Sequence, residues 1–344
     1  MSVDSTLAAL VAADRTEDAI DALRAEGVYD DSRSVAPRED RVALPVTAPP
    51  ETTDVDAVVA ADLPRRAPDL PALLRDRGWT DAEVERAPGS WAVVGSVVLV
   101  DPGDAPRPDE VGEALLDLHG EADTVLARGE IAGRTRDPDV EVLAGVGETE
   151  TIHVEHGTRY ALDLATVMFS PGNEAERVRM GEVVAPGERV FDMFAGVGYF
   201  TLPMARAGAQ VTAAEIDPTA YRFLVENAVL NGVEDRIDAY RADCRDVSAT
   251  ADRAVMGYYG VADGAGARTD EAHEYLDTAF AALDPGGTVH LHEATPEAEL
   301  PDRPVGRLEA AADARDRGVE VEAVRRVKSH SAGVWHVVVD ARVA

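Results

Sequence analysis

A pair of glycines and three acidic residues follow three successive predicted strands, at the points where loops begin. The run VFDMFAGVGYF contains Asp192, Gly196 and Gly198, and two glycines after a strand let the backbone approach a ligand closely at a helix N-terminus. Glu215 ends the next strand, where a carboxylate suits two ribose hydroxyls, and Asp243 ends the third, within reach of an adenine edge. Each acid alone is more simply explained as a helix cap or a solvated residue. Together they favour a site for a nucleoside-containing cofactor.

The elements that must position these residues alternate between strands and helices from about residue 166. This alternation predicts an α/β fold with a doubly wound, mostly parallel sheet. The last two strands, 320–327 and 334–340, are too close in sequence for a crossover helix and must pair as an antiparallel hairpin. A parallel sheet with such a terminal hairpin is typical of class I, Rossmann-like S-adenosylmethionine-dependent methyltransferases rather than of dinucleotide oxidoreductases. The other expected strands are 189–194, 210–215, 237–241, 253–256 and 288–292, and the expected helices are 199–207, 218–231, 270–283 and 305–317.

Two smaller segments are expected before this domain of residues 166–344. Residues 89–165 are predicted to form a small α+β domain, with a buried strand at Trp91–Val100 and a helix at Glu110–Leu118. Residues 1–88 are predicted to form a short N-terminal domain and linker, a helical piece with a helix at Glu17–Glu26 and a short strand-like run at Arg41–Val46. Further strands of the middle domain are expected near 140–143 and 150–155.

The net charge of the chain indicates the environment in which the protein works, and it says little about the fold. The 344 residues carry 33 basic and 65 acidic side chains, a net charge of −32, while 45% of residues are hydrophobic, which excludes a disordered acidic tail. Lys328 is the only lysine, and 5% of residues are aromatic. This composition indicates a cytosolic protein from a high-salt organism, where a Debye length of about 3 Å at 1 M salt screens the surface charge. A merely acidic mesophilic enzyme is the alternative, which the near absence of lysine disfavours.

Signals for export and membrane insertion are also absent from the sequence, so a cytoplasmic location is expected. Cys244 is the only cysteine, which excludes a disulfide framework and a cysteine zinc site. The first twenty residues include early acids and no basic segment, unlike a signal peptide. The longest apolar run, Trp91–Val100, is too short to span a bilayer.

Several runs of sequence carry a resemblance to a known family. They are DMFAGVGYFTLPMA, AAEIDPTAYRFLVENAVLNGVEDRI, RADCRDV, residues 140–180, VMGYY, HLHE and VKSHSAGVWHVVVD. These runs resemble the enzymes that modify position 37 of tRNA, namely the guanine-N1 methyltransferases and their relatives in the wybutosine pathway. The resemblance covers about residues 89–344, while residues 19–46 resemble the small N-terminal domain of the group more weakly. It implies an RNA-binding role for residues 89–165.

Two positions separate the subfamilies. The guanine-N1 methyltransferases place an arginine after Phe-Ser-Pro, and after the fourth strand an Asn-x-Pro motif whose amide holds a nitrogen nucleophile in line with the methyl group. This chain has Gly172-Asn173 at the first position and Met256-Gly257-Tyr258 at the second. It is therefore more similar to the archaeal aminocarboxypropyltransferases of wyosine biosynthesis. That resemblance implies transfer of the 3-amino-3-carboxypropyl group from S-adenosylmethionine to C7 of 4-demethylwyosine at position 37 of tRNA-Phe, with release of methylthioadenosine.

Three alternative functions stay open. The main one is a tRNA guanine-37 N1-methyltransferase, which acts one step earlier on the same nucleotide and which the two positions above disfavour. The second is a non-catalytic protein that binds tRNA or S-adenosylmethionine, although the intact set of acids and glycines favours retained cofactor binding. A small-molecule methyltransferase would leave residues 89–165 without an evident role.

The resemblance also implies roles for individual residues. Ser170 and Arg177 are expected near the cofactor, Glu215 at the ribose, and Asp243 with Cys244 at the adenine. For Arg177 the simpler interpretation is an exposed helix pair with a neighbouring glutamate, which would contribute little. The proton that leaves C7 needs an acceptor, and the sequence does not identify a catalytic residue for this step.

Histidines and tyrosines near the carboxyl ends of the later strands are weaker candidates. His290 and His292 point to the same face of one strand, but Glu293 points away, so no metal site is expected there. A structural role or a place in the substrate pocket is the preferred interpretation of these histidines. Tyr258 and Tyr259 suit stacking on an unpaired base, and packing in the core is an equal alternative.

The expected macromolecular partner is tRNA, through the anticodon loop of tRNA-Phe, and not DNA or a membrane. Two small basic islands stand out in the acidic chain, and they suit phosphate contacts or arise by chance. The protein is expected to act as a monomer. The glycine-rich run 260–269 is either a mobile lid or an insertion without a role. The islands are Arg128, Arg134 and Arg136, and Arg325, Arg326 and Lys328.

We expect the transfer activity to appear only at high potassium chloride. At low salt the charge of −32 is unscreened, and repulsion both within the chain and against RNA is strongest. The measurement is product formation as a function of salt from dilute buffer to molar potassium chloride. Full activity in dilute buffer would contradict the inference of a saline environment.

Overall fold

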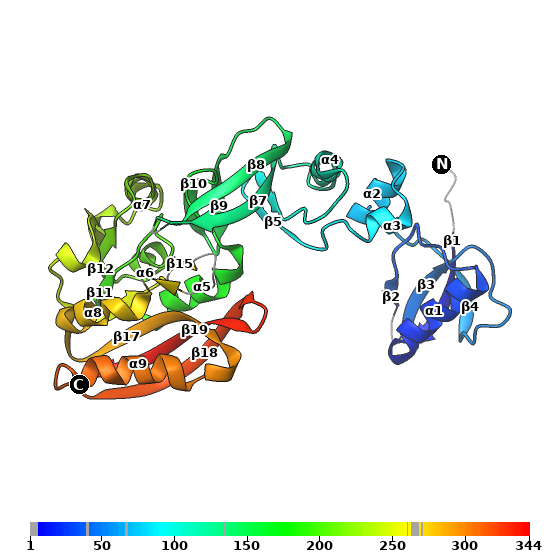
Figure 1. Ribbon diagram of the computed structural model, residues 1–344. Helices are drawn as coiled ribbons and strands as arrows, with labels where there is room; N and C mark the ends of the chain where they lie inside the picture. Colours follow the sequence, from blue (N-terminus) through cyan, green and yellow to red (C-terminus); the bar gives the residue numbers. More distant parts are fainter. Residues whose placement is uncertain are drawn as a thin grey trace. The chain divides into compact units, whose positions relative to one another are not determined.

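The computed structural model divides into two units, Met1–Asp76 and Arg77–Ala344 (Figure 1). It describes residues 6–38, 41–65, 68–133, 135–259, 261–262, 268–269 and 271–344. Most of the glycine-rich run 260–269 therefore lies outside the described residues, apart from the short strands β15 (Val261–Ala262) and β16 (Arg268–Thr269). Within the described ranges, the helices all lack the combination of length and hydropathy that crossing a bilayer requires. The three domain boundaries expected from the sequence remain a prediction.

The first unit is a four-stranded antiparallel sheet with helices: the expected helix and the expected strand at Arg41–Val46 are present, and β1, β2 and β4 are additional strands that turn the expected helical piece into a sheet domain. The apolar run at residues 7–11 forms the central strand, and the sheet has the order β2-β3-β1-β4. Helix α1 packs Leu23 against Leu44 of the sheet and ends at Gly27, whose φ of +76° closes the last turn. The elements are β1 (Thr6–Ala12), α1 (Thr16–Glu26), β2 (Ala36–Arg38), β3 (Arg41–Val46), β4 (Ala57–Ala61) and α2 (Leu70–Asp76).

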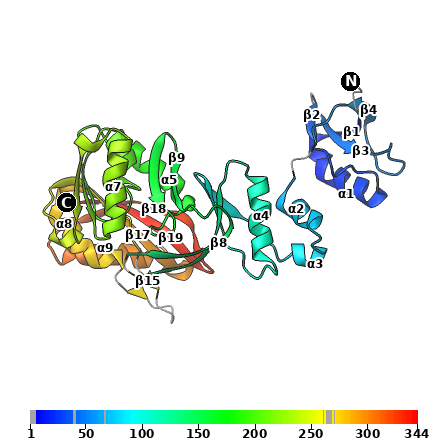
Figure 2. The same cartoon turned by 90° about the horizontal axis from the view of Figure 1, so that it is seen from above.

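The second unit begins with the expected α+β layer. The single strand expected at Trp91–Val100 is instead a hairpin, because Gly95 adopts a φ of +58° and reverses the chain between β5 and β6. Strand β6 then pairs in parallel with β7, and α4 packs against β7 and β8 (Figure 2). The elements are α3 (Asp81–Val84), β5 (Trp91–Val94), β6 (Val97–Val100), α4 (Pro108–Leu118), β7 (Thr124–Ala132) and β8 (Asp137–Gly145).

A separate hairpin, β9 (Glu150–Glu155) and β10 (Thr158–Asp163), connects this layer to the large sheet. On one side, the Ser96 backbone N–H donates to Thr151 Oγ1 at 2.9 Å. On the other side, the buried Asn227 amide of helix α7 (Pro218–Leu230) accepts from the Ala161 N–H at 2.7 Å and donates to the Ala161 carbonyl at 3.0 Å. The hairpin is thus fixed to both neighbours by side-chain to backbone hydrogen bonds.

The large sheet confirms the expected architecture. Its order is β13-β12-β11-β14-β17-β19-β18; the first five strands are parallel, and β19 is antiparallel to both β17 and β18. The terminal hairpin therefore inserts its second strand between β17 and its first strand. The strands are β11 (Arg189–Asp192), β12 (Gln210–Glu215), β13 (Ile237–Arg241), β14 (Ala251–Met256), β17 (Leu283–Pro296), β18 (Val319–Ser331) and β19 (Val334–Val343).

Successive residues of each strand point to opposite faces of this sheet, and their side chains pack into two separate hydrophobic cores. Val190 and Ala213 belong to the core that also contains Met180, Leu202 and Leu224 of α5, α6 and α7. The neighbouring residues Phe191 and Ala214 belong to the second core, with residues of α8 and α9, and α9 lies along β17 and β18 (Figure 1). The remaining helices are α5 (Glu174–Val183), α6 (Thr201–Arg206), α8 (Leu276–Ala282) and α9 (Asp302–Asp313), with 3-10 turns at Ala13–Arg15, Pro171–Asn173, Glu234–Arg236, Cys244–Asp246, Ala272–Tyr275 and Glu297–Glu299.

Candidate functional site

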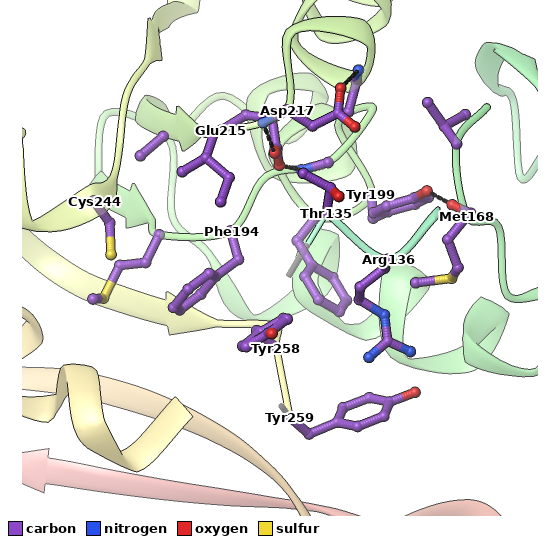
Figure 3. A pocket seen from close by; sticks show the side chains of 18 of the residues that line it. Thr135, Arg136, Met168, Phe194, Tyr199, Glu215, Asp217, Cys244, Tyr258 and Tyr259 are labelled. Carbon is purple, nitrogen blue, oxygen red and sulfur yellow. Dashed lines mark hydrogen bonds between the residues drawn. The ribbon is translucent and has the colours of Figure 1, made fainter. Parts of the chain in front are cut away.

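A pocket opens at the carboxyl ends of β11 and β12, where loops leave the parallel sheet (Figure 3). It holds about 1060 Å³, including the part open to solvent, and its walls come from loops far apart in the sequence. Figure 3 shows Cys244 on one side of the pocket and Arg136 with Met168 on the opposite side. We call these the Cys244 end and the Arg136 end. Such a position, at the carboxyl ends of parallel strands, is the general place for ligands in sheets of this kind.

Glu215, at the end of β12, joins two loops in the middle of the pocket. Its two carboxylate oxygens accept the backbone N–H groups of Gly196 and Asp217, each at 2.7 Å (Figure 3). Each oxygen retains a further acceptor site toward the pocket. Burial raises the pKa of Glu215 to about 7. Gly196 itself has a φ of +56°, and a Cβ there would lie 2.3 Å from the Tyr199 ring, so the loop requires glycine.

Asp243 and Cys244 follow β13 and form the wall at the Cys244 end of the pocket. Asp243 caps the following turn by accepting from the Arg245 N–H at 3.0 Å, and it also accepts from the Arg245 guanidinium at 2.6 Å. Cys244 is buried, and burial raises the pKa of its thiol to about 12. The thiol is therefore an apolar wall and not a nucleophile.

Arg177 lines the pocket, but its charge is already neutralised. Its guanidinium donates twice to the carboxylate of Glu155 in β9, at 2.6 Å each, and both side chains are nearly fully buried. A third hydrogen bond, at 3.0 Å, goes to the Ser170 carbonyl, and the Phe169 ring lies 4.7 Å from the guanidinium carbon. The exposed helix pair considered for Arg177 is therefore wrong. Its clearest role is to position the 169–170 segment beside the pocket.

Aromatic rings form much of the pocket wall, and several of them were not singled out from the sequence. Phe194 stacks on Tyr258 with ring centroids 5.1 Å apart and planes 20° apart, and it meets Tyr275 edge-on at 5.1 Å. Tyr199 donates from its hydroxyl to the Met168 carbonyl. Phe194 and Tyr199 lie within the glycine-containing run, which was the available signal, whereas nothing in the sequence marked Tyr275 as a neighbour. Tyr258 and Tyr259 both line the pocket.

Asp192 and Gly198, also expected in the site, support the pocket from behind and do not line it. Asp192 is fully buried and accepts from the Thr201 hydroxyl at 2.7 Å, which ties the end of β11 to the start of α6. Burial raises its pKa to about 6. Gly198 has a φ of +105°, and a Cβ would lie 2.7 Å from Leu202 Cγ. The remaining expected residues do line the pocket: Ser170, Arg177, Gly196, Glu215, Asp243 and Cys244.

The residues of the two basic islands expected to contact RNA phosphates have different partners in the structure. Arg325 is occupied by Glu176 at 2.5 Å and Asp340 at 3.1 Å, and Arg326 pairs with Glu297 at 2.9 Å. Lys328 instead donates to Ser170 Oγ. In the first island, Arg136 lies in the pocket over the Tyr259 ring at 5.0 Å, while Arg134 lies outside the described residues. The charge of Arg325 is therefore neutralised within the protein, while contact of the 325–328 island with RNA stays a prediction.

The histidines of β17 are bound within the protein. His290 Nδ1 lies 2.6 Å from the Asp340 carboxylate, and its Nε2 lies 2.6 Å from Arg253. His292 Nδ1 lies 3.0 Å from His336 Nε2, and burial lowers the pKa of His292 to about 3. Across the described ranges, no three histidine, cysteine, aspartate or glutamate side chains converge as a metal ion would require.

The strand order and the pocket together define a class I methyltransferase-like, Rossmann-like fold. A family model described as the TRM5/TYW2 methyltransferase domain matches residues 151–322, and a model described as the TYW2 N-terminal domain matches residues 71–149. The chain belongs to the TRM5/TYW2 family.

Individual relatives agree with this assignment. The tRNA(Phe) (4-demethylwyosine(37)-C(7)) aminocarboxypropyltransferase of Pyrococcus horikoshii is 41% identical over 267 residues, which cover 76% of this chain and 91% of the relative. The structure of P. horikoshii TYW2 in complex with MeSAdo superposes with a TM-score of 0.69 at 36% identity and covers 80% of this chain and 99% of the other. The structure of Trm5b from Pyrococcus abyssi superposes with a TM-score of 0.73 at 29% identity and covers 98% of this chain and 99% of the other.

The buried Asp192 carboxylate predicts a defined pH dependence of stability. Its pKa is raised from 3.8 to about 6, so the folded protein holds this proton more tightly than the unfolded chain does. Its contribution to stability is therefore lost as the pH rises from about 4 to about 6, by up to about 3 kcal/mol. We expect the free energy of unfolding of Asp192→Asn, minus that of the parent protein, to increase over this range. Denaturant titrations at constant high salt measure it, and a flat difference would contradict the raised pKa.

Proposed function

We propose that this chain transfers the 3-amino-3-carboxypropyl group of S-adenosylmethionine to C7 of 4-demethylwyosine at position 37 of tRNA-Phe. In this reaction the donor supplies an electrophilic Cγ: C7 bonds to Cγ, the Cγ–S bond breaks with its electron pair going to sulfur, methylthioadenosine leaves, and C7 releases its proton. Support comes from the 41% identity to a relative with this printed activity and from that relative's family.

The observation that carries the proposal is the segment after β14. A nitrogen nucleophile in a methyltransferase of this group is supported there by the amide of an Asn-x-Pro motif, whereas here Gly257 and Tyr258 line the pocket. A Cβ at Gly257 would lie 2.6 Å from the Phe200 ring, so this wall packs an aromatic ring against bare backbone. The wall lacks the side-chain amide that would support in-line methylation.

The residues of the pocket fit S-adenosylmethionine as the donor. Glu215 offers acceptor sites for the ribose hydroxyls while it holds the Gly196 loop in place. Asp243 and the apolar Cys244 wall suit the adenine at the Cys244 end. Ser170 borders the pocket beside Arg136, and Arg177 fixes the Ser170 backbone. The aromatic rings exclude water from the space between, where the orientation of the donor decides which carbon reacts.

The wider setting belongs to the same proposal. The tRNA-Phe anticodon loop is the macromolecular partner, and Tyr259 under Arg136 is a stacking platform for the unpaired base. The proposal includes a cytoplasmic location and a monomeric state, and the charge of −32 with a single lysine supports a high-salt organism.

Product mass tests the transfer directly. We expect protein in strong potassium chloride, given S-adenosylmethionine and tRNA-Phe carrying 4-demethylwyosine, to add an aminocarboxypropyl increment to the digested nucleoside and to release methylthioadenosine. The matched substrate is tRNA-Phe with unmodified guanosine at position 37. A methyl increment on that guanosine, with S-adenosylhomocysteine released, would establish the guanine-N1 methyltransferase instead. Donor binding without either product would establish a non-catalytic binding protein.

The raised pKa of Glu215 predicts that the affinity for a nucleoside falls at acid pH. Because its pKa is about 7, the carboxylate becomes protonated as the pH falls through 7 and loses its capacity as a double acceptor. We expect calorimetry to show that methylthioadenosine binds more weakly below pH 7, and that Glu215→Gln binds about 10- to 100-fold more weakly at pH 8 without this step. The exposed Glu226→Gln on α7 is the control and should keep the parent profile. An unchanged affinity in Glu215→Gln would remove Glu215 from the site.

A further inference from the structure

A lysine side chain, Lys328, lies against the Ser170–Gly172 turn at the edge of the pocket. Lys328 of β18 donates to Ser170 Oγ, and Ser170 itself lines the pocket. The lysine also packs against Gly172, where a Cβ would lie 3.2 Å from Lys328 Cδ and 3.7 Å from its Nζ. The only lysine of the chain is thus half-buried directly behind a pocket residue.

Among the residues that the structure describes, none supplies an anion that compensates the charge of Lys328. The charged groups that act on it are Arg177, Arg136 and Arg128, all of the same sign, and they join burial in lowering its pKa to about 8. Of these, Arg177 is neutralised by Glu155. Within the described part of the chain, Lys328 makes no ion pair, whereas Arg325 and Arg326 on the same strand each pair with a carboxylate. In a chain with about twice as many acids as bases, this leaves an anion-binding position beside the pocket.

We propose that Lys328, together with the Ser170 hydroxyl, holds the α-carboxylate of the S-adenosylmethionine donor. This inference rests on the proposed function, because it assigns one part of that donor. A charge-assisted hydrogen bond from the ammonium is stronger than one between neutral groups, and the adjacent hydroxyl supplies a second donor. Arg177, which was also expected near the cofactor, is neutralised by Glu155 and donates to the Ser170 carbonyl as well.

Anchoring the carboxylate here has a consequence for the reaction. The adenosine part of the donor belongs with Glu215, Asp243 and Cys244, while Lys328 acts beside Ser170 and Arg136. Fixing both parts of the donor restricts the methionine chain between them, and orientation of that chain selects Cγ over the methyl carbon for attack. Lys328 is therefore a binding and specificity residue, and not the acceptor of the C7 proton.

The test compares two ligands that differ in the aminocarboxypropyl group. Calorimetry in molar potassium chloride measures S-adenosylmethionine and methylthioadenosine binding to the parent protein and to Lys328→Met. We expect Lys328→Met to bind S-adenosylmethionine about 10- to 100-fold more weakly and methylthioadenosine as the parent does. Lys328→Arg retains the charge and should recover part of the loss. Arg326→Met, which removes an exposed charge from the same strand, is the control and should change neither affinity.

A third ligand, decarboxylated S-adenosylmethionine, tests the contribution of the carboxylate alone. The parent should bind it more weakly than S-adenosylmethionine, and Lys328→Met should distinguish the two less than the parent does, because it keeps the Ser170 hydroxyl but has lost the charged partner of the carboxylate. Equal losses for S-adenosylmethionine and methylthioadenosine would overturn the proposal, as would no loss for either. A loss confined to tRNA affinity would also overturn it and would assign the lysine to a phosphate.

These outcomes stay separate from those of the proposed function. The binding measurements involve no transfer, so they remain interpretable if the product proves to be methylated guanosine. Conversely, an aminocarboxypropyl product from the parent protein with unchanged donor affinity in Lys328→Met would overturn only the role of the lysine. Thermal unfolding of Lys328→Met and Lys328→Arg shows whether each variant is folded, and Lys328→Arg keeps the proposal testable if Lys328→Met is not.

Discussion

The buried ion pair between Arg177 and Glu155 is the contact on which the geometry of the pocket depends. Both of its hydrogen bonds are 2.6 Å long, and a third bond fixes the Ser170 carbonyl, so the pair joins β9, α5 and the turn that borders the pocket. Removing one partner of such a pair leaves an unpaired buried charge, which typically costs about 3–5 kcal/mol. Because the pair neutralises Arg177 within the protein, Lys328 rather than Arg177 is the residue proposed to bind an anion.

The architecture of the large sheet could be predicted from the sequence, because parallel strands and crossover helices have distinct periods and lengths. On the N-terminal side the strand at Arg41–Val46 could be predicted, but β1 and the hairpin within Trp91–Val100 were not. The apolar run at residues 7–11 is compatible with a buried strand or a buried helix face until its pairing with β3 and β4 is known. The run Trp91–Val100 is apolar except for Ser96, and the prediction of a single strand overlooked the Gly95-Ser96 pair, which is the two-residue turn between β5 and β6.

In the candidate site, too, residues marked by local sequence signals could be predicted, whereas contacts between distant parts of the chain could not. Glu215 and Asp243 could be located because strand ends and turn signals are local, and both do line the pocket. The partner of Arg177 could not, since Glu155 lies 22 residues earlier on a separate hairpin. Lys328 looked like part of a basic surface island, because nothing nearby in the sequence indicates that β18 brings it to Ser170, 158 residues away.

The solitary lysine also makes this molecule unusually simple to address chemically. Across the 344 residues, Lys328 offers the single ε-amine, so a reagent that acylates such amines has one side-chain target. That target is half-buried against Ser170 rather than on open surface, and its lowered pKa increases the fraction of nucleophilic free amine. Protection of this one amine from the reagent therefore measures occupancy of the pocket without a tag or a mutation. A composition with a single lysine thus provides a chemical reporter next to the pocket.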